Sequence, residues 1–337
     1  MRHHPCTFAF RHWTRAASTL AILISALTTS AVVASEGVAA AAQPGWSVPE
    51  HVAPGQYLAS VSCPTSSFCL AVGSGYDSSS VGNGTFGVAL TWDGSRWSSS
   101  REVDGYGGLT SVACRSASSC VAVDLSGYAV AWDGRNWSQP QFVARGYLSG
   151  VSCPASGPCV TTDGLTGTAY ALSGGTWTRD GQPDRHRGQS LQVSCPRGGY
   201  CMVVGGDGTS ATGAGTWSPA GGPGPELVGV SCPVPRWCAV VGRTAANSPG
   251  YVGVTLDGQW ENTTVRGFVP SAVSCASTTF CVATGRSRAV IWDGRSRSWS
   301  QPQVVDPTNT GLTAISCPAA SSCLAVDAAG NVMDWRS

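Results

Sequence analysis

Short segments in which apolar and polar residues alternate recur along this chain, separated by turns rich in glycine and serine. One repeat shows the pattern in full. An alternating segment spans 109–114, a tight turn follows at 115–119, and further segments cover 120–123 and 127–132 before a fourth begins at Trp137. Alternation with a period of two is typical of β-strands that bury one face. The pattern predicts four short strands per repeat and no long helix beyond the first 42 residues.

Cysteine pairs with the spacing C-x5-C mark the junction of the first two strands in each repeat. The first members of successive pairs are 51, 39, 42, 37, 43 and 42 residues apart. Four short strands in about 42 residues is the length of one β-propeller blade. The sequence therefore predicts an all-β fold, a seven-bladed β-propeller with four-stranded antiparallel blades. The expected disulfides are Cys63–Cys69, Cys114–Cys120, Cys153–Cys159, Cys195–Cys201, Cys232–Cys238, Cys275–Cys281 and Cys317–Cys323.

Zinc binding and redox chemistry are the alternatives to disulfides for these cysteines. Zinc sites favour C-x2-C-like spacing, usually with histidine. No pair here has that spacing, and beyond residue 42 the chain contains only His51 and His186. A reactive cysteine needs a nearby charged group that lowers the pKa of its thiol, and no such group recurs beside the seven repeated pairs. We therefore expect disulfides, with no metal and no cofactor.

The two ends of the chain complement each other. The last repeat ends soon after Trp335, which aligns with Trp132, so this repeat lacks a fourth strand. Residues 43–49 contain Trp46 and match the start of the fourth strand at Trp137. We expect the N-terminal strand to complete the last blade and close the ring, because closure removes exposed strand edges.

The first 42 residues have the features of a secretory signal peptide. Three arginines charge its start, residues 16–34 are apolar and small, and small residues precede a cleavage site near Ala42 or, alternatively, after Ala34. An uncleaved membrane anchor is the other interpretation of the apolar run. The fifteenth cysteine, Cys6, lies in the part that cleavage would remove. We expect a secreted or cell-surface protein whose single domain spans 43–337.

Charge and composition argue against several kinds of partner. Residues 43–337 contain 17 Arg and 18 Asp plus Glu, and lysine is absent from the whole chain. The chain has neither a basic stripe of the kind that binds nucleic acid nor a polybasic tail for a lipid surface. We expect no nucleic-acid partner, no membrane contact beyond the signal segment, and a monomer.

A Trp-Asp-Gly-x-x-Trp segment joins the third and fourth strands at 92–97 and 132–137, with a longer version at 292–299. Asp-Gly is typical of a type I′ hairpin turn. The first tryptophan is replaced by Leu172, Thr212 and Leu256 in three repeats. Indole rings can stack on sugars, but a residue repeated in every blade favours packing between sheets. The second tryptophan occurs in all seven repeats, as Trp46, Trp97, Trp137, Trp177, Trp217, Trp260 and Trp299.

This hairpin resembles the Asp-box of the bacterial neuraminidase-like (BNR) repeat, whose motif is S-x-D-x-G-x-x-W. Over residues 43–337 the whole unit resembles exported bacterial propellers with one disulfide hairpin per blade. The third and fourth repeats depart from the pattern, because Ser173-Gly174-Gly175 and Gly213-Ala214-Gly215 lack the aspartate. In sialidases that carry Asp-boxes the box is a structural turn remote from catalysis, so the resemblance implies a fold more than an activity.

The second-to-third and fourth-to-first connections of a four-stranded meander share one rim of a propeller, and here they carry the sequence variation. They cover 73–86, 101–108, 178–190, 218–226, 242–250 and 261–270. Binding sites usually lie in variable loops on a rigid scaffold. The dense charge at 184–187 is either part of such a site or a solvated loop tip. The candidate ligand-binding residues are Asp104, Tyr106, Arg145, Tyr147, Arg179, Asp184, Arg185, His186, Arg187, Arg243 and Arg266, and no catalytic residue is predicted.

Three functions fit this sequence. The favoured one is an exported, non-catalytic binding module for a glycan or for an extracellular or envelope protein. The first alternative, implied by the Asp-box resemblance, is a sialidase-like glycoside-acting enzyme. It would need an arginine cluster, a tyrosine paired with a glutamate, and an acid, whereas Glu50, Glu102, Glu226 and Glu261 lie beside no matching motif. The second alternative is an architectural cell-surface protein.

Overall fold

The computed structural model describes residues 45–77, 84–186, 188, 190–197, 199–220, 224, 226–243, 250–256 and 259–337. The chain separates into two units, Met1–Ala41 and Ala42–Ser337. The predicted signal peptide, 1–42, lies outside the described residues and stays a prediction. Within the described part of the chain, no helix has the length and apolar character needed to cross a membrane.

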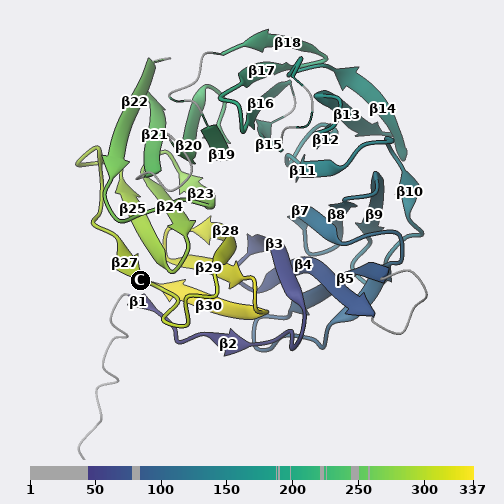
Figure 1. Ribbon diagram of the computed structural model, residues 1–337, viewed down its shortest axis with the longest axis horizontal. Helices are drawn as coiled ribbons and strands as arrows, with labels where there is room; N and C mark the ends of the chain where they lie inside the picture. The colour runs from purple at the N-terminus through teal and green to yellow at the C-terminus, as the bar shows by residue number, and fades with distance from the viewer. Residues whose placement is uncertain are drawn as a thin grey trace, which may run out of the picture. The chain divides into compact units, whose positions relative to one another are not determined.

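The second unit is a seven-bladed β-propeller, as the repeat predicts. Seven antiparallel sheets surround a common axis, with one strand of each sheet toward the centre (Figure 1). We number the blades along the chain and label their strands A to D from the inside outward. Each A strand contacts the A strands of both neighbouring blades around the ring.

The strand bounds follow the predicted order in every blade. The A strands are β3 (Tyr57–Thr65), β7 (Leu109–Ser116), β11 (Leu148–Ser152), β15 (Leu191–Arg197), β19 (Glu226–Val234), β23 (Ala272–Ser277) and β28 (Leu312–Ala319). The B strands are β4 (Phe68–Asp77), β8 (Ser119–Asp124), β12 (Cys159–Asp163), β16 (Tyr200–Gly205), β20 (Trp237–Arg243), β24 (Phe280–Gly285) and β29 (Ser322–Asp327). The C strands are β5 (Gly84–Trp92), β9 (Tyr128–Trp132), β13 (Thr168–Ser173), β17 (Ser210–Ala214), β21 (Gly250–Leu256), β25 (Arg288–Asp293) and β30 (Asn331–Arg336). The D positions hold β6 (Arg101–Asp104), β10 (Gln141–Phe142), β14 (Thr176–Gly181), β18 (Thr216–Pro219), β22 (Gln259–Val265), the broken pair β26 (Ser298–Trp299) and β27 (Gln303–Val304), and the broken pair β1 (Gly45–Trp46) and β2 (Glu50–His51).

The N-terminal strands close the ring, which confirms the prediction from the chain ends. Both β1 and β2 pair with β30, the third strand of blade 7 (Figure 1). Trp46 lies opposite Trp335, and the two indole centroids are 5.8 Å apart. The Ser47 N–H also donates to the Asp334 carbonyl oxygen at 2.7 Å. Blade 7 is therefore built from both ends of the propeller sequence.

The seven predicted disulfides are all present, with Cα atoms of each pair 4.0 to 4.1 Å apart. The serine before the first cysteine has a role that the sequence did not reveal. It accepts a hydrogen bond from the backbone N–H of the matching cysteine in the next blade, as between Ser62 and Cys114 at 3.0 Å. The same bond occurs at Ser152, Ser194, Ser231, Ser274 and Ser316. Ala113 replaces this serine in blade 2.

The tryptophans of the C–D hairpins pack between neighbouring sheets, as expected, with Trp132 and Trp137 lying against the core cluster of blades 1 and 2. In blade 2 the Trp132 and Trp137 rings are 5.6 Å apart, and Trp132 Nε1 donates to the Ala117 carbonyl oxygen at 3.0 Å. All seven second tryptophans are half-buried. The prediction of Thr212 and Leu256 at the first position was wrong by one residue. The strand register places Gly213 opposite Cys201, and Thr255 opposite Trp260, at that position.

The Asp-Gly segments of blades 1 and 2 do not form the predicted two-residue type I′ turn. Trp132 pairs with Trp137, so the loop has four residues, and of these only Gly134 has a positive φ, +98°. The Asp133 carboxylate instead accepts the N–H groups of Arg135 and Asn136. A two-residue loop with both φ values positive occurs in blade 3 at Gly174-Gly175, where the aspartate is missing.

The hydrophobic core lies between adjacent blades. Between blades 1 and 2, Leu70 and Val72 of β4 pack with Leu109 and Val112 of β7, and similar clusters join other neighbours. Because every sheet is covered on both faces by its neighbours, the free surface lies on the outer D strands and on the loops at the two ends of the ring. The A–B and C–D turns form one end, here called the disulfide rim. The B–C and D–A connections form the other, the loop rim.

Candidate binding site on the loop rim

A groove of about 380 Å³ opens where the A strands of blades 1 to 4 begin. Its lining combines aromatic and aliphatic side chains with hydroxyl and amide groups. Tyr57 and Leu125 are 45 % and 57 % exposed, and Tyr147 is half-buried beside them. The lining residues are Tyr57, Ala59, Ser74, Thr85, Gly108, Leu109, Thr110, Leu125, Tyr147, Ser149, Ser190 and Gln192.

Local turn chemistry places Leu125 at the groove. Asp124, at the end of β8, accepts the N–H groups of Ser126 and Tyr128 and so fixes the B–C turn of blade 2. The Leu125 N–H donates to the Gly108 carbonyl oxygen of the preceding D–A connection at 3.3 Å. A Cβ added at Gly108 would lie 2.7 Å from the Ser74 side chain, so a larger residue there would crowd the groove.

An aromatic cluster joins the D–A connection that carries Tyr106 to the C and D strands of blade 2. Tyr106 stacks on Tyr128 with ring centroids 4.3 Å apart, and Phe142 approaches Tyr128 edge-on at 5.5 Å. Tyr106 and Phe142 are 59 % and 52 % exposed. Exposed apolar side chains that gather together are typical of an interaction surface. The groove and this cluster together form the candidate binding site.

Two buried carboxyl groups meet beneath the candidate site, at the interface of blades 1 and 2. Asp104 and Asp124 are 1 % and 0 % exposed, and among the described residues no third group donates to Oδ2 of either, so the two carboxyl groups can bond only each other there. Burial, together with the negative charge of Asp104, raises the pKa of Asp124 to about 6. Burial also raises the pKa of Asp104. The pair is therefore most stable when it holds a proton.

At the interface of blades 6 and 7 the equivalent pair of carboxyl groups accepts hydrogen bonds instead. The Thr310 hydroxyl lies within hydrogen-bond distance of both Asp306 Oδ2 and Asp327 Oδ2 and can donate its one proton to either, and Asn331 Nδ2 donates to Asp327 Oδ2 at 2.7 Å. Burial acts to raise the pKa of Asp306, but hydrogen bonds from Thr308 and Thr310 outweigh it and lower that pKa. The two interfaces thus have opposite pH dependence.

We expect Asp124→Asn to stabilise the protein at neutral pH. Because the folded pKa of Asp124, about 6, exceeds its ordinary value of 3.8, the group contributes stability below pH 4 that is lost as the pH rises through 6. Removing this charge should raise the free energy of unfolding at pH 7.5 by about 1 to 2 kcal/mol, allowing for solvent screening. Urea denaturation between pH 4 and 8 measures both effects. Asp306→Asn is the matched control and should destabilise; destabilisation by both changes would contradict the assignment.

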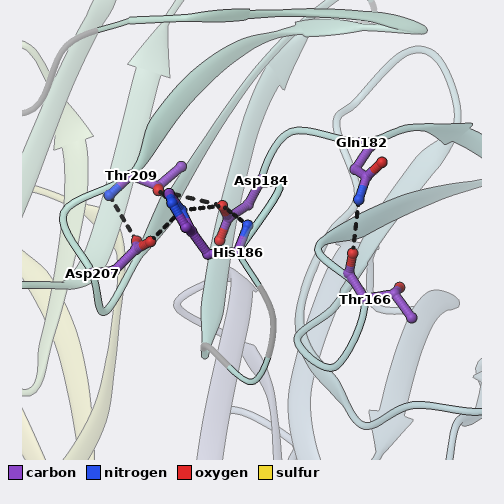
Figure 2. A network of polar contacts seen from close by, with 6 residues as sticks. All are labelled: Thr166, Gln182, Asp184, His186, Asp207 and Thr209. Atoms are coloured by element: carbon purple, nitrogen blue, oxygen red, sulfur yellow. Dashed lines mark hydrogen bonds and ion pairs between the residues drawn. The ribbon is translucent and has the colours of Figure 1, made fainter.

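A second cluster lies at the interface of blades 3 and 4. Figure 2 shows His186 between the carboxylates of Asp184 and Asp207, with Thr209 beside them. The side chain of Asp184 is 1 % exposed, whereas that of His186 is 71 % exposed. Residues of the D–A connection of blade 3 and the B–C turn of blade 4 line an adjacent hollow of about 520 Å³.

The predicted site residues fall into separate groups. Tyr147 lines the groove, and the connection that carries Asp104 and Tyr106 leads into it. Asp184 and His186 belong to the second cluster, and Arg185 lines its hollow. Arg243 forms an ion pair with Glu226 at 2.6 Å. Arg145, Arg179 and Arg266 are exposed, and Arg187 lies outside the described residues. Ligand binding by these residues stays a prediction.

Sequence reasoning missed Tyr57, Leu125, Asp124 and Asp207. Leu125 and Asp207 occupy short B–C turns that the repeat treats as regular. The predicted variable loop 73–86 is largely strand, because β4 continues to Asp77 and β5 begins at Gly84. The sequence did contain one signal for Leu125, because an apolar residue inside a short B–C turn indicates an exposed apolar side chain.

Solved structures with the same architecture include proteins of different functions. The structure titled "YCF48 bound to D1 peptide" has a TM-score of 0.62 at 14 % identity, covering 88 % of this chain and 97 % of that one. The WD40 β-propeller domain of Doa1 has a TM-score of 0.69 at 12 % identity, covering 87 % of this chain and 97 % of that one.

A catalytically inactive variant of virginiamycin B lyase from Staphylococcus aureus, solved with quinupristin, has a TM-score of 0.66 at 8 % identity. The match covers 88 % of this chain and all of that one. No protein-family model matches the sequence, and no curated protein matches it significantly. At these identities the similarity establishes the propeller fold alone, so function must be argued from the site.

Proposed function

We propose that this protein is an exported, non-catalytic binding module that holds a segment of a partner protein in the groove of the loop rim. The groove itself carries the proposal. Tyr57, Leu125 and Tyr147 offer apolar contact, while Thr110, Ser149 and Gln192 can bond a peptide backbone. Apolar anchors with a few polar groups are typical of protein recognition sites.

Two further observations support export and a protein ligand. Disulfides persist in oxidising compartments outside the cytosol, and this chain has seven. That fits the predicted signal peptide. The structure of YCF48 contains a bound peptide, so a propeller of this architecture can carry such a ligand.

The sialidase-like alternative receives less support from the geometry. A tyrosine and a glutamate do meet, at Tyr251 and Glu226, but Tyr251 is 4 % exposed and its hydroxyl donates to the Glu226 backbone. Burial, with the charge of Glu226, raises the pKa of Tyr251 to about 12, whereas a nucleophile needs a lowered pKa. The adjacent carboxyl groups of Asp104 and Asp124 are buried away from any sugar.

We expect Leu125→Arg to abolish or strongly weaken binding of a peptide selected on the oxidised domain, residues 43–337. Peptide display would supply the ligand, and a glycan array would be screened in parallel. The charged side chain would fill the groove, so the dissociation constant should rise at least about tenfold. Biolayer interferometry measures this change.

Leu165→Arg is the control, because Leu165 lies two residues after Asp163 in the B–C turn of blade 3, is 46 % exposed, and does not line the groove. Equal binding by both variants would refute the site. Saturable binding to a glycan alone would show that the ligand is a glycan and not a peptide. Binding to neither would favour the architectural role.

A further inference from the structure

Three potential metal ligands converge at the interface of blades 3 and 4 (Figure 2). His186 Nδ1 lies 2.6 Å from Asp207 Oδ2 and 3.1 Å from Asp184 Oδ1. The Thr209 hydroxyl lies 3.4 Å from both Asp184 Oδ1 and His186 Nδ1. One ring nitrogen therefore faces two carboxylates at once. It can carry only one proton, so it cannot donate a good hydrogen bond to both.

The buried half of the cluster gives an independent reason to expect a cation. The side chain of Asp184 is 1 % exposed, and its carboxylate points into the cluster. Its Oδ2 is buried and has no hydrogen-bond partner among the described residues. A buried carboxylate oxygen without a partner is costly. A bound cation would compensate that oxygen and the charge of Asp207 together.

The backbone of blade 4 makes room for this arrangement. Leu191 pairs with Gly205, at the position where blades 2, 3 and 7 have an aspartate opposite the equivalent leucine. A Cβ at Gly205 would lie 3.2 Å from Asp207 Oδ1. Blade 4 therefore has no carboxylate at the end of its B strand, and Asp207 in the following B–C turn supplies one instead.

The location of Asp207 in the B–C turn also leaves the cluster open to solvent. The Asp207 side chain is 21 % exposed, whereas the paired Asp306 and Asp327 at the blade 6–7 interface are completely buried. The hollow of about 520 Å³ beside the cluster gives access to Asp184, His186 and Thr209. An ion held here would keep coordination positions for water or another ligand.

We infer that Asp184, His186 and Asp207 bind one divalent transition-metal ion, with Zn²⁺ the expected occupant. Imidazole nitrogen with carboxylate oxygens suits zinc, which takes four ligands, often with one left for water. Calcium prefers six to eight oxygen ligands and is a poorer match. A tetrahedral ion with bonds of about 2.1 Å separates its ligand atoms by about 3.4 Å, so Asp207 and His186 need to part by less than about 1 Å. This inference is independent of the peptide-binding groove.

Calorimetric titration of the oxidised, EDTA-treated domain, residues 43–337, with ZnCl₂ tests the site. We expect one Zn²⁺ per chain and a melting temperature that rises with zinc concentration. His186→Ala and Asp207→Asn change exposed or partly exposed side chains, so both variants should fold, and each should weaken binding by at least about tenfold. Co²⁺ should give a visible absorption spectrum in the wild type and not in His186→Ala.

His51→Ala is the matched control, because His51 lies on blade 7, away from the cluster, where its Nδ1 contacts Asn331 Oδ1. This variant should bind zinc as the wild type does. Absence of saturable zinc binding up to millimolar concentration would overturn the inference. So would zinc binding that survives both His186→Ala and Asp207→Asn. Binding of CaCl₂ but not ZnCl₂ would refute the zinc assignment.

Discussion

Deletion of residues 43–52 is expected to destabilise the propeller severely and to cause association of the product. The deletion removes β1 and β2 and leaves the outer edge of β30 unpaired. It also uncovers Trp335, which is 8 % exposed when Trp46 packs beside it. Loss of this packing and of the hydrogen bonds to β30 should lower the free energy of unfolding by on the order of 5 kcal/mol. An open strand edge also invites pairing between chains.

Urea denaturation and size-exclusion chromatography measure these two effects. Trp46→Ala isolates the packing contribution and should cost about 2 kcal/mol, because Trp46 is only half-buried. Val48→Ala is the control, since Val48 is 82 % exposed and should change nothing. A synthetic peptide of residues 43–52 should restore stability to the truncated chain. A truncated chain that stays monomeric with unchanged stability would show that closure contributes little.

Reduction of the seven disulfides is expected to unfold the domain under conditions in which the oxidised form is stable. Each bridge joins cysteines six residues apart. A loop of this size contributes about 2 kcal/mol in the chain-entropy model. The sum over seven bridges is comparable to the whole stability of an ordinary domain. The core offers little reserve, because alanine and valine occupy much of the space between the blades.

Removal of one bridge should have a graded effect. Cys114→Ala combined with Cys120→Ala should lower the free energy of unfolding by about 2 kcal/mol. Denaturant titration of the variant and the wild type, with and without a reducing agent, measures the loss in free energy of unfolding for one bridge and for all seven. Ser274→Ala is a useful comparison, because it leaves the bridges intact and removes one hydrogen bond between blades, to the Cys317 N–H. It should cost about 1 kcal/mol. Full stability after reduction would show that the bridges are dispensable.

The two rims of the propeller differ in a way that suits the proposed binding role, although hollows of about 470 and 660 Å³ also occur on the disulfide rim. The disulfide rim is tied by the bridges and by tryptophan N–H bonds to the A–B turns, as between Trp292 and Thr278 at 3.1 Å. The loop rim lacks these ties among the described residues and carries the groove, the aromatic cluster and the predicted zinc site. A rigid scaffold with one variable end is the usual arrangement for binding loops.

The architecture could be predicted from the sequence because it depends on local spacing. The C-x5-C pairs, the alternation of apolar residues and the repeat length act within one blade, where neighbours in sequence are neighbours in space. Ring closure was equally accessible, because Trp46 and Trp335 each match a position in a complete repeat. The errors at Thr212 and Leu256 arose where the C–D hairpins change length, since alignment to the repeat cannot tell which residue faces the cysteine.

The sites depended on contacts between blades, which the repeat does not encode. Asp104 and Asp124 are 20 residues apart in sequence, yet their carboxyl groups meet because one ends a D strand and the other a B strand of the next blade. Asp207 reaches His186 for the same reason, across the blade 3–4 interface. The sequence by itself determined the blades, their bridges and their closure. Only the tertiary structure decided that Asp104 and Asp124 share a buried interface, where burial raises their pKa values, and that His186 lies between Asp184 and Asp207, where we infer the cation site.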